Sequence, residues 1–131
     1  MKNIVKIIAL TLLTIMALTC FAGCGQKADG DLAYVKEKGE LVVGITDFAP
    51  MDYKNDKGEW IGFDADMAKL FAESLDVEVE FVEINWDTKF VTLDSKKIDC
   101  IWNGMTISDE VKANCDVSKA YVKNAQVVVM K

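Results

Sequence analysis

Arginine and histidine are both absent from the 131-residue sequence, so all 15 basic side chains are lysines. Acidic residues outnumber them at 21, which gives a formal charge of −6 and an isoelectric point of about 4.6. An acidic chain repels the phosphate backbone of nucleic acids. Without histidine, the usual residue for proton transfer and metal binding near neutral pH is missing. The composition therefore argues against a nucleic-acid partner and against histidine-based catalysis or metal binding, and we expect neither a metal nor a cofactor.

The apolar run near the N-terminus is too short for a comfortable membrane span. It extends from Ile7 to Leu18, the length of a signal-peptide core, after a positive start at Lys2 and Lys6. The following "FAGC" resembles the lipobox of bacterial lipoproteins, although Phe21 stands where leucine is usual. The resemblance implies removal of residues 1–23, acylation of Cys24, and an extracytoplasmic protein anchored to the cell membrane by lipid. The alternative is an ordinary secretory signal that is cut nearby.

The next segment, residues 24–39, is expected to be a lipidated tether followed by a lead-in to the domain. The stretch 25–30 within it is short and polar, as is typical of a tether. Beyond Gly30 roughly 100 residues remain, enough for one small domain with a modest core. Cys100 and Cys115 lie in this part of the chain. As a secreted pair they invite a disulfide, and in their apolar contexts they also fit free buried thiols.

Strands and helices are expected to alternate along the rest of the chain. Runs rich in β-branched residues, or with alternating apolar residues, predict strands at 40–46, 77–84, 98–102 and 127–130. The stretch "YKNDKGEWIGF" predicts a small hairpin. Three helices are expected between the strands, and their predicted capping residues are Asp64, Asp87, and either Thr106 or Ser108. The apolar face of the first helix is predicted to consist of Met67, Leu70, Phe71 and Leu75.

This order predicts an α/β fold, a mainly parallel sheet flanked by helices. In such sheets, ligands bind beyond the carboxyl ends of the strands. The segments "DFAP", "NWD" and "NGMT" follow three of the predicted strands. An apolar slot with a few fixed polar groups suits a small polar organic ligand. The candidate ligand-binding residues are Asp47, Phe48, Trp86, Asn103, Gly104 and Thr106.

Plainer structural roles are also open for some of these residues. Taken alone, Phe48 and Trp86 would more often be core aromatics, and for Asn103 capping a turn is as open as facing the ligand. Trp102 is expected to pack rather than to bind.

A family resemblance rests on four segments: "LVVGITDFAPMDY", "GFDADMAKLFAESL", "WDTKFVTLDSKKIDCIWNGMTISDE" and "DVSKAYVKNAQVVV". Together they resemble the first lobe of the polar amino-acid-binding proteins of ABC importers, which are two-lobed flytraps of the periplasmic-binding-protein-like type II fold. The resemblance implies that residues 40–131 form lobe 1, ending at the hinge strand, with the second lobe absent from a truncated product or fragment.

The same resemblance implies roles for individual residues. Phe48 and Trp86 match the aromatic walls that sandwich the ligand. The backbone carbonyl of Gly104 would accept from the ligand ammonium, and the hydroxyl and N–H of Thr106 would meet its α-carboxylate, with Asn103 beside them.

The sequence departs from the family at Val111, where an arginine normally pairs with the ligand carboxylate. A planar guanidinium holds a carboxylate in a way that a lone ammonium does not. The adjacent Lys112 is turned about 100° away on a helix. Three explanations stay open: the ligand lacks the usual carboxylate, backbone N–H groups at the helix start hold it, or the missing lobe supplies the charge.

The leading functional interpretation is a lipid-anchored solute-binding protein. It would deliver a small polar solute, an amino acid or a relative of one, to the permease of an ABC importer. The alternatives are a vestigial or scaffold lipoprotein lobe with no ligand, and an enzyme on the same fold. The lack of histidine and of a nucleophile–base pair argues against the enzyme.

Overall fold

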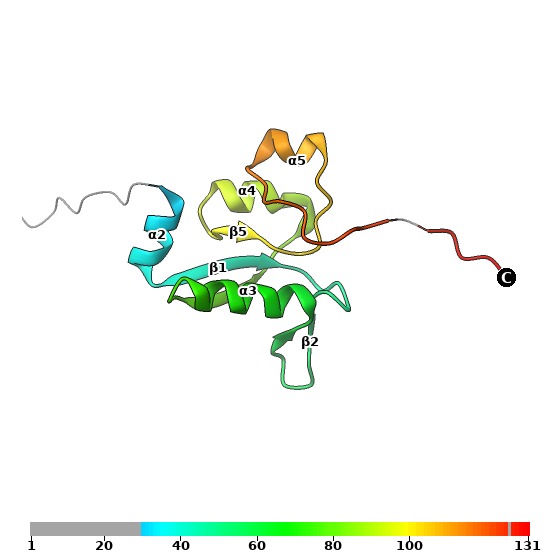
Figure 1. Cartoon of the computed structure of the whole chain (residues 1–131), viewed down its shortest axis with the longest axis horizontal. Coiled ribbons are helices and arrows are strands. Elements are labelled where there is room, and N and C mark those ends of the chain that lie inside the picture. The colour runs from blue at the N-terminus through cyan, green and yellow to red at the C-terminus, as the bar shows by residue number, and fades with distance from the viewer. Residues whose placement is uncertain (1–29, 126) are drawn as a thin grey trace, which may run out of the picture. The chain divides into compact units, whose positions relative to one another are not determined.

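The computed structural model describes residues 30–125 and 127–131, so the expected signal peptide, Cys24 and most of the polar tether lie outside the described residues (Figure 1). The chain divides into two compact units, residues 1–34 and 35–131. Of the first unit the structure describes residues 30–34, where helix α2 (Asp31–Lys38) begins. The sheet, the cores and the cleft described below belong to the second unit.

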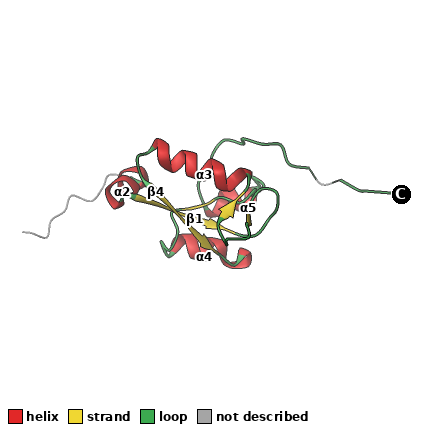
Figure 2. Cartoon of the chain, turned by 90° about the horizontal axis from the view of Figure 1, so that it is seen from below, coloured by secondary structure: helices red, strands yellow, loops and turns green. Residues whose placement is uncertain are grey.

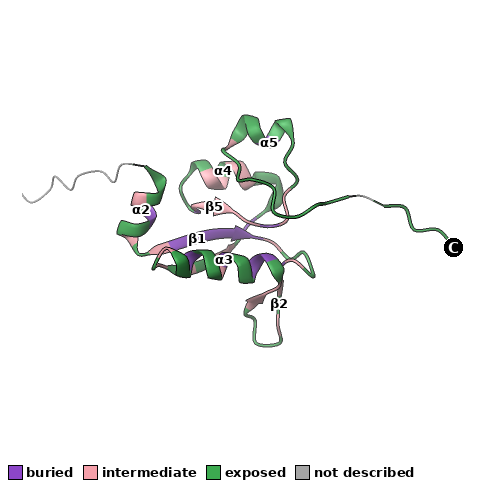
Figure 3. Cartoon of the chain, viewed as in Figure 1, coloured by how far each residue is buried: buried purple, intermediate pink, exposed green. Residues whose placement is uncertain are grey.

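Three parallel strands form the central sheet. Strand β1 (Glu40–Ile45) lies between β4 (Glu78–Glu83) and β5 (Cys100–Ile101). Its pairing with β4 runs from Glu40 opposite Glu78 to Ile45 opposite Glu83. Because β1 has a strand on each side, every residue after Glu40 in it is buried (Figure 3). The prediction of an α/β fold with a mainly parallel sheet is confirmed.

Helices cover both faces of this sheet (Figure 2). Helix α3 (Phe63–Ser74) lies on one face and helix α4 (Lys89–Asp94) on the other. On the α3 side the buried cluster is Val35, Leu41, Val43, Ala68 and Ala72. On the α4 side it is Val42, Ile84 and Ile98, with Leu93 packed against them. Successive residues of β1 thus point to opposite faces, as a strand requires.

The buried face of α3 differs from the prediction. Its apolar buried residues are Ala65, Ala68 and Ala72, whereas Leu70 is 60% exposed and Phe71 44% exposed. Small side chains let the helix backbone approach the sheet closely, and the large residues are left at its flanks. A pattern based on large apolar residues alone therefore assigned the wrong face.

Two of the predicted helix caps are also wrong. Helix α3 begins after Gly62, and Asp64 is fully buried rather than capping. Ahead of α4, Asn85 caps the short 3-10 helix η1 (Trp86–Thr88) by accepting from the N–H of Asp87, which leaves Asp87 exposed. The third cap is Ser108, one of the two predicted alternatives, which accepts from the Val111 N–H at the start of helix α5 (Asp109–Asn114).

Gly62 is required by the approach of α3 to the loop before it. The N–H of Phe63 donates to the Pro50 carbonyl at 3.3 Å, and the N–H of Asp64 donates to the Met51 carbonyl at 2.9 Å. Gly62 has a φ of +121°, and a Cβ there would collide with the Met51 carbonyl. The predicted hairpin lies within this connection, as antiparallel strands β2 (Tyr53–Lys54) and β3 (Trp60–Ile61).

The predicted strand at residues 127–130 does not form. These four residues are without regular structure, and Val127 to Met130 are 79–91% exposed. A β-branched run becomes a strand only when another strand offers hydrogen-bond partners. None of the described strands pairs with this run.

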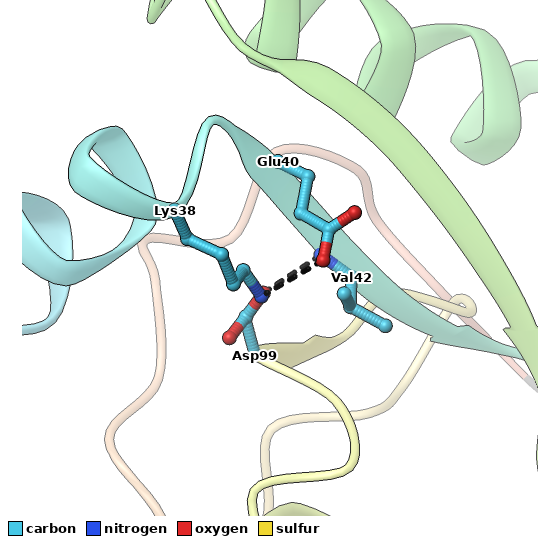
Figure 4. A network of polar contacts seen from close by, with 4 residues as sticks. All are labelled: Lys38, Glu40, Val42 and Asp99. Carbon is cyan, nitrogen blue, oxygen red and sulfur yellow. Dashed lines mark hydrogen bonds and ion pairs between the residues drawn. The ribbon is translucent and has the colours of Figure 1, made fainter.

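The amino end of the sheet is held by a polar network (Figure 4). The Asp99 carboxylate accepts from the Lys38 ammonium at 2.6 Å and from the Val42 N–H at 2.7 Å. Lys38 also lies 3.8 Å from the Glu40 carboxylate. Asp99, just before β5, is thereby tied to β1 and to the end of α2.

Both cysteines in this unit, Cys100 and Cys115, are free thiols. Burial and the neighbouring Asp99 raise the pKa of Cys100 to about 12. Burial, together with Asp116 and Asp94, also raises the pKa of Cys115. Both thiols therefore stay protonated at neutral pH. Separately, none of the helices within the described ranges has the length and apolarity that a membrane span requires.

Candidate ligand-binding cleft

A cleft of about 420 Å³ lies beyond the carboxyl ends of the three parallel strands. The structure brings all six sequence-predicted candidates to its walls: Asp47, Phe48, Trp86, Asn103, Gly104 and Thr106. Four further residues that were not among those candidates also line it: Thr46, Lys89, Met105 and Val111. The candidates come from three separate strand ends, so the parallel topology accounts for their meeting. Their binding of a ligand stays a prediction.

The two aromatic candidates are side chains of the cleft surface. Phe48 is 51% exposed and Trp86 is 36% exposed, which is more than a core aromatic would be. Phe48 is fixed through its backbone, since its N–H donates to the Asp52 carbonyl and the Asp52 N–H donates back to its carbonyl. Trp86 begins the 3-10 helix that Asn85 caps. Trp102, by contrast, packs against the α3-side core and meets the Phe71 ring edge-on, as predicted.

Gly104 lies at the point where the chain leaves β5 and turns toward the cleft. Its φ is +57°, and a Cβ there would lie 3.3 Å from the Phe48 ring. Glycine therefore serves both the left-handed backbone and the close packing of Phe48. A larger residue would press on one aromatic wall.

Asn103 lines the cleft, but its amide is occupied within the protein. Its Oδ1 accepts from the Thr46 N–H, and its Nδ2 donates to the Thr46 hydroxyl at 2.9 Å. The side chain is 7% exposed. Asn103 therefore joins the ends of β1 and β5, which favours a positioning role over direct ligand contact.

Thr106 and Asp47 differ in the interactions that they form within the protein. The Thr106 hydroxyl accepts from Asn124 Nδ2 at 3.1 Å, so residues 18 apart in the sequence meet at the edge of the cleft. Asp47 is exposed and forms no ion pair with any described residue. Asp47 is thus available to an external partner.

Position 111 presents an apolar wall. Val111, in α5, is 6% exposed and lines the cleft. The neighbouring Lys112 does not line the cleft and lies 3.8 Å from the Asp109 carboxylate on the exposed side of the helix. The carboxylate clamp that the resemblance placed at this position is therefore not replaced by Lys112.

Lys89 is the functional candidate that sequence reasoning missed. Its ammonium lies 4.7 Å from the ring centroids of both Trp86 and Phe90, and it donates to the Trp86 carbonyl at 3.2 Å. A signal was present, because Lys89 follows Trp86 by three residues. That spacing returns a side chain to the same side of a helical turn.

Two acids are buried in this part of the fold, and one of them, Asp64, lies near Gly104. Asp52 and Asp64 are both fully buried, and the Tyr121 hydroxyl donates to Asp64 Oδ1 at 2.8 Å. Neither carboxylate oxygen of Asp52 has a hydrogen-bond partner among the described residues. Burial, and then the charge of Asp64, raise the pKa of Asp52 to about 7. Burial and the bond to Asp64 also raise the pKa of Tyr121.

No metal centre is visible in the described part of the chain, where no three His, Cys, Asp or Glu side chains gather as metal ligands. Among the residues that line the cleft, Asp47 is the acidic side chain and Lys89 is the basic one. The arrangement offers a polarised apolar slot: two aromatic surfaces, backbone polar groups around Gly104, and one charge of each sign.

The parallel sheet with helices on both faces and a cleft at the strand ends defines the class of protein, a single lobe of the periplasmic-binding-protein-like type II fold. The chain belongs to the bacterial extracellular solute-binding proteins, family 3, whose family model matches residues 41–131.

Individual relatives agree with this membership. The chain is 37% identical to the L-cystine-binding protein TcyJ of Escherichia coli, over 92% of this chain and 47% of that protein. It therefore spans about half the length of this curated relative. Among solved structures, an ancestral cyclohexadienyl dehydratase matches with a TM-score of 0.67 and 39% identity, over 70% of this chain and 38% of that one. The arginine-bound form of domain 1 from TmArgBP matches with a TM-score of 0.59 and 41% identity, over 61% of this chain and 64% of that one.

Proposed function

We propose that this lobe captures a small polar solute, an amino acid, outside the cytoplasm for an ABC importer. The observation on which this rests most is the meeting of six residues from three strand ends around one cleft with exposed aromatic walls. Pockets for small ligands are typically lined by apolar and aromatic side chains together with a few well-placed polar groups. An amino acid offers an aliphatic body for these walls and two charged groups for the polar edge.

Binding would be non-covalent, and a second lobe would close over the ligand and exclude water. The permease would then recognise the closed form. Support for capture by a first lobe comes from the domain 1 structure of TmArgBP, which is described as arginine-bound. A lobe alone leaves half of the ligand in water, so we expect this chain by itself to bind amino acids no tighter than about millimolar.

We also propose that the protein is held at the membrane by lipid on Cys24. The support is the charged start, the short apolar run and "AGC", all of which lie outside the described residues. Mass spectrometry of the protein from a bacterial host tests this directly. An acylated Cys24 at the amino terminus is the expected result. An unmodified Cys24, or a chain that retains Phe21, would contradict it.

Binding without turnover is proposed in preference to catalysis. The titratable side chains that line the cleft are Asp47 and Lys89, and the two free thiols are held protonated. One structural neighbour is described as a dehydratase, so the enzyme alternative has a specific observation behind it. An assay of this chain for cyclohexadienyl dehydratase activity, the activity named for that neighbour, would distinguish the two. We expect no turnover.

A thermal-shift screen tests the proposed function. The full chain, kept in detergent because of its apolar N-terminal run, is heated with L-cystine, L-glutamine, L-histidine or L-arginine. At about 20 mM ligand and a dissociation constant of about 1 mM, linkage predicts about 1.8 kcal/mol of stabilisation, which raises the melting temperature by several degrees. Because cystine dissolves poorly, it is also tested on this lobe joined to the second lobe of a relative. No shift with any amino acid in either form would favour the vestigial lobe instead.

A further inference from the structure

We propose that Lys89 is the residue that binds the carboxylate of the ligand, in place of the arginine that the family resemblance puts at position 111. The proposal rests on the proposed function, since it assigns a role at the same cleft. It also narrows the ligand class to solutes that have a carboxylate and no net positive charge.

The charges of the cleft support this assignment. Lys89 is the only cationic side chain among the residues that line it, and Asp47 is the only acidic one. The ion pairs within the described part of the chain include neither residue. Two opposite charges that face one cleft without pairing each other leave both free for a partner. A zwitterionic amino acid presents the complementary pair.

The local surroundings of Lys89 hold its ammonium at the aromatic wall. It lies over the faces of Trp86 and Phe90, each 4.7 Å from the ring centroid, and such contacts favour a cation. The Trp86 carbonyl takes one of its three N–H donors, which leaves two for a ligand. The ammonium is therefore oriented but not saturated.

Position 111 cannot supply this group, because Val111 is a buried wall and Lys112 lies outside the cleft beside Asp109. The placement of Lys89 also has a consequence for selectivity. A ligand with a cationic side chain that stacks on Trp86 would meet the Lys89 ammonium on the same ring. We therefore expect neutral or acidic amino acids to bind, and arginine to bind more weakly than they do.

The experiment compares each amino acid with its amide, which lacks the carboxylate charge. The full ¹⁵N-labelled chain in detergent is titrated with L-glutamine, L-cystine or L-arginine and with the corresponding amides, and the Trp86 indole N–H signal is followed by NMR. In the unaltered protein we expect at least one neutral acid to bind about tenfold or more tighter than its amide, and tighter than arginine. This is the usual size of one charge-assisted hydrogen bond.

Lys89→Met removes the positive charge while keeping a side chain of similar length. It should lower the affinity for the amino acid to that for its amide. Lys89→Arg should keep the preference for the acid. Lys97→Met is the matched control, because Lys97 is exposed and does not line the cleft. Equal melting temperatures of the three variants would show that folding is unchanged.

The outcomes separate this proposal from the proposed function. Binding that Lys89→Met leaves unchanged overturns the role of Lys89 but keeps the lobe as an amino-acid binder. A preference for arginine over the neutral acids overturns the charge argument in the same way. If neither acid nor amide moves the Trp86 signal, the proposed function is contradicted, and the role of Lys89 with it.

Discussion

The two ends of the parallel sheet use charged residues in opposite ways. At the amino end, Asp99 is satisfied by the Lys38 ammonium and the Val42 N–H, and its side chain is only 12% exposed. At the carboxyl end, Asp47 and Lys89 line a cleft without an ion pair. Both ends combine a single lysine with acidic side chains, Asp99 and Glu40 at the amino end and Asp47 at the carboxyl end. The amino end uses them to hold strands together, and the carboxyl end presents them to a partner.

The difference shows how a small α/β lobe separates stability from binding. Charged groups that pair within the chain contribute to the stability of the fold. Charged groups that are left unpaired must instead be hydrated by water or contact a ligand. Substitutions of the same type should therefore affect mainly stability at the amino end and mainly ligand binding at the carboxyl end. Both effects can be measured.

The largest difference is expected between two tryptophans near the carboxyl end. Trp102→Ala should lower the free energy of unfolding by about 3 kcal/mol, because Trp102 packs on the core and against Phe71. Trp86→Ala should cost less than about 1 kcal/mol but weaken ligand binding, since Trp86 is a wall of the cleft. Urea denaturation of both variants checks this. Equal losses would place Trp86 in the core and remove the aromatic wall.

A matched pair of acids tests the two ends directly. Asp99→Ala should cost about 2–3 kcal/mol, because it leaves a partly buried ammonium and a backbone N–H without their acceptor. Asp47→Ala should change stability by no more than about 0.5 kcal/mol, since Asp47 is exposed and unpaired. Both values come from the same denaturation series. A cost at Asp47 as large as at Asp99 would show that Asp47 has a structural partner.

A smaller effect, measured as ligand affinity, is expected when the positive charge is moved from position 89 to position 111. In a two-lobed form of the protein, Val111→Arg should restore the carboxylate affinity that Lys89→Met removes, by about tenfold or about 1.4 kcal/mol. Calorimetry with L-glutamine, or with whichever amino acid stabilises the protein most, measures it. No restoration would mean that the ligand carboxylate does not lie beside α5. Val111→Arg alone serves as the control for strain at this buried position.

A separate prediction concerns how stability depends on pH through the buried Asp52. Its pKa is raised to about 7 in the folded protein, whereas in the unfolded chain it is about 3.9. Between these values the folded state binds the extra proton, so this group's contribution to stability is lost as pH rises from about 4 to about 7. At each pH, the free energy of unfolding of Asp52→Asn is compared with that of the unaltered chain. The stabilisation caused by the substitution should therefore be larger at pH 8 than at pH 5. An identical pH dependence in the two proteins would show that Asp52 is ionised throughout.

The strand ends could be predicted from the sequence because the β/α alternation fixes which edge of the sheet they share. That rule placed Phe48, Trp86 and Thr106 at one cleft, whereas the role of Gly104 came from the family resemblance. Lys89 was missed because a single lysine at the start of a helix is ordinary by composition, and its value depends on the ring faces that only the fold brings beside it. The α3 face was misassigned because close packing on a sheet selects alanine over larger apolar residues.

Long-range pairing accounts for the other differences. Asp64 was predicted as a cap, but Tyr121, 57 residues further on, supplies its partner instead. The amide of Asn103 is satisfied by Thr46, also 57 residues away. Residues 127–130 have strand propensity, but none of the described strands pairs with them. Local sequence patterns do not encode such partners.

Mapping where an amino acid contacts the lobe is the most direct test. The ¹⁵N-labelled full chain is titrated with the amino acid that raises its melting temperature most, and every assigned amide is followed by NMR. The structure predicts the largest shifts at the Gly104 amide and the Trp86 indole, with no shift at the Val42 amide that donates to Asp99. Shifts centred on Val42 and Lys38, or a stabilising ligand that leaves Gly104 and Trp86 unmoved, would contradict a binding cleft at the carboxyl ends of the strands.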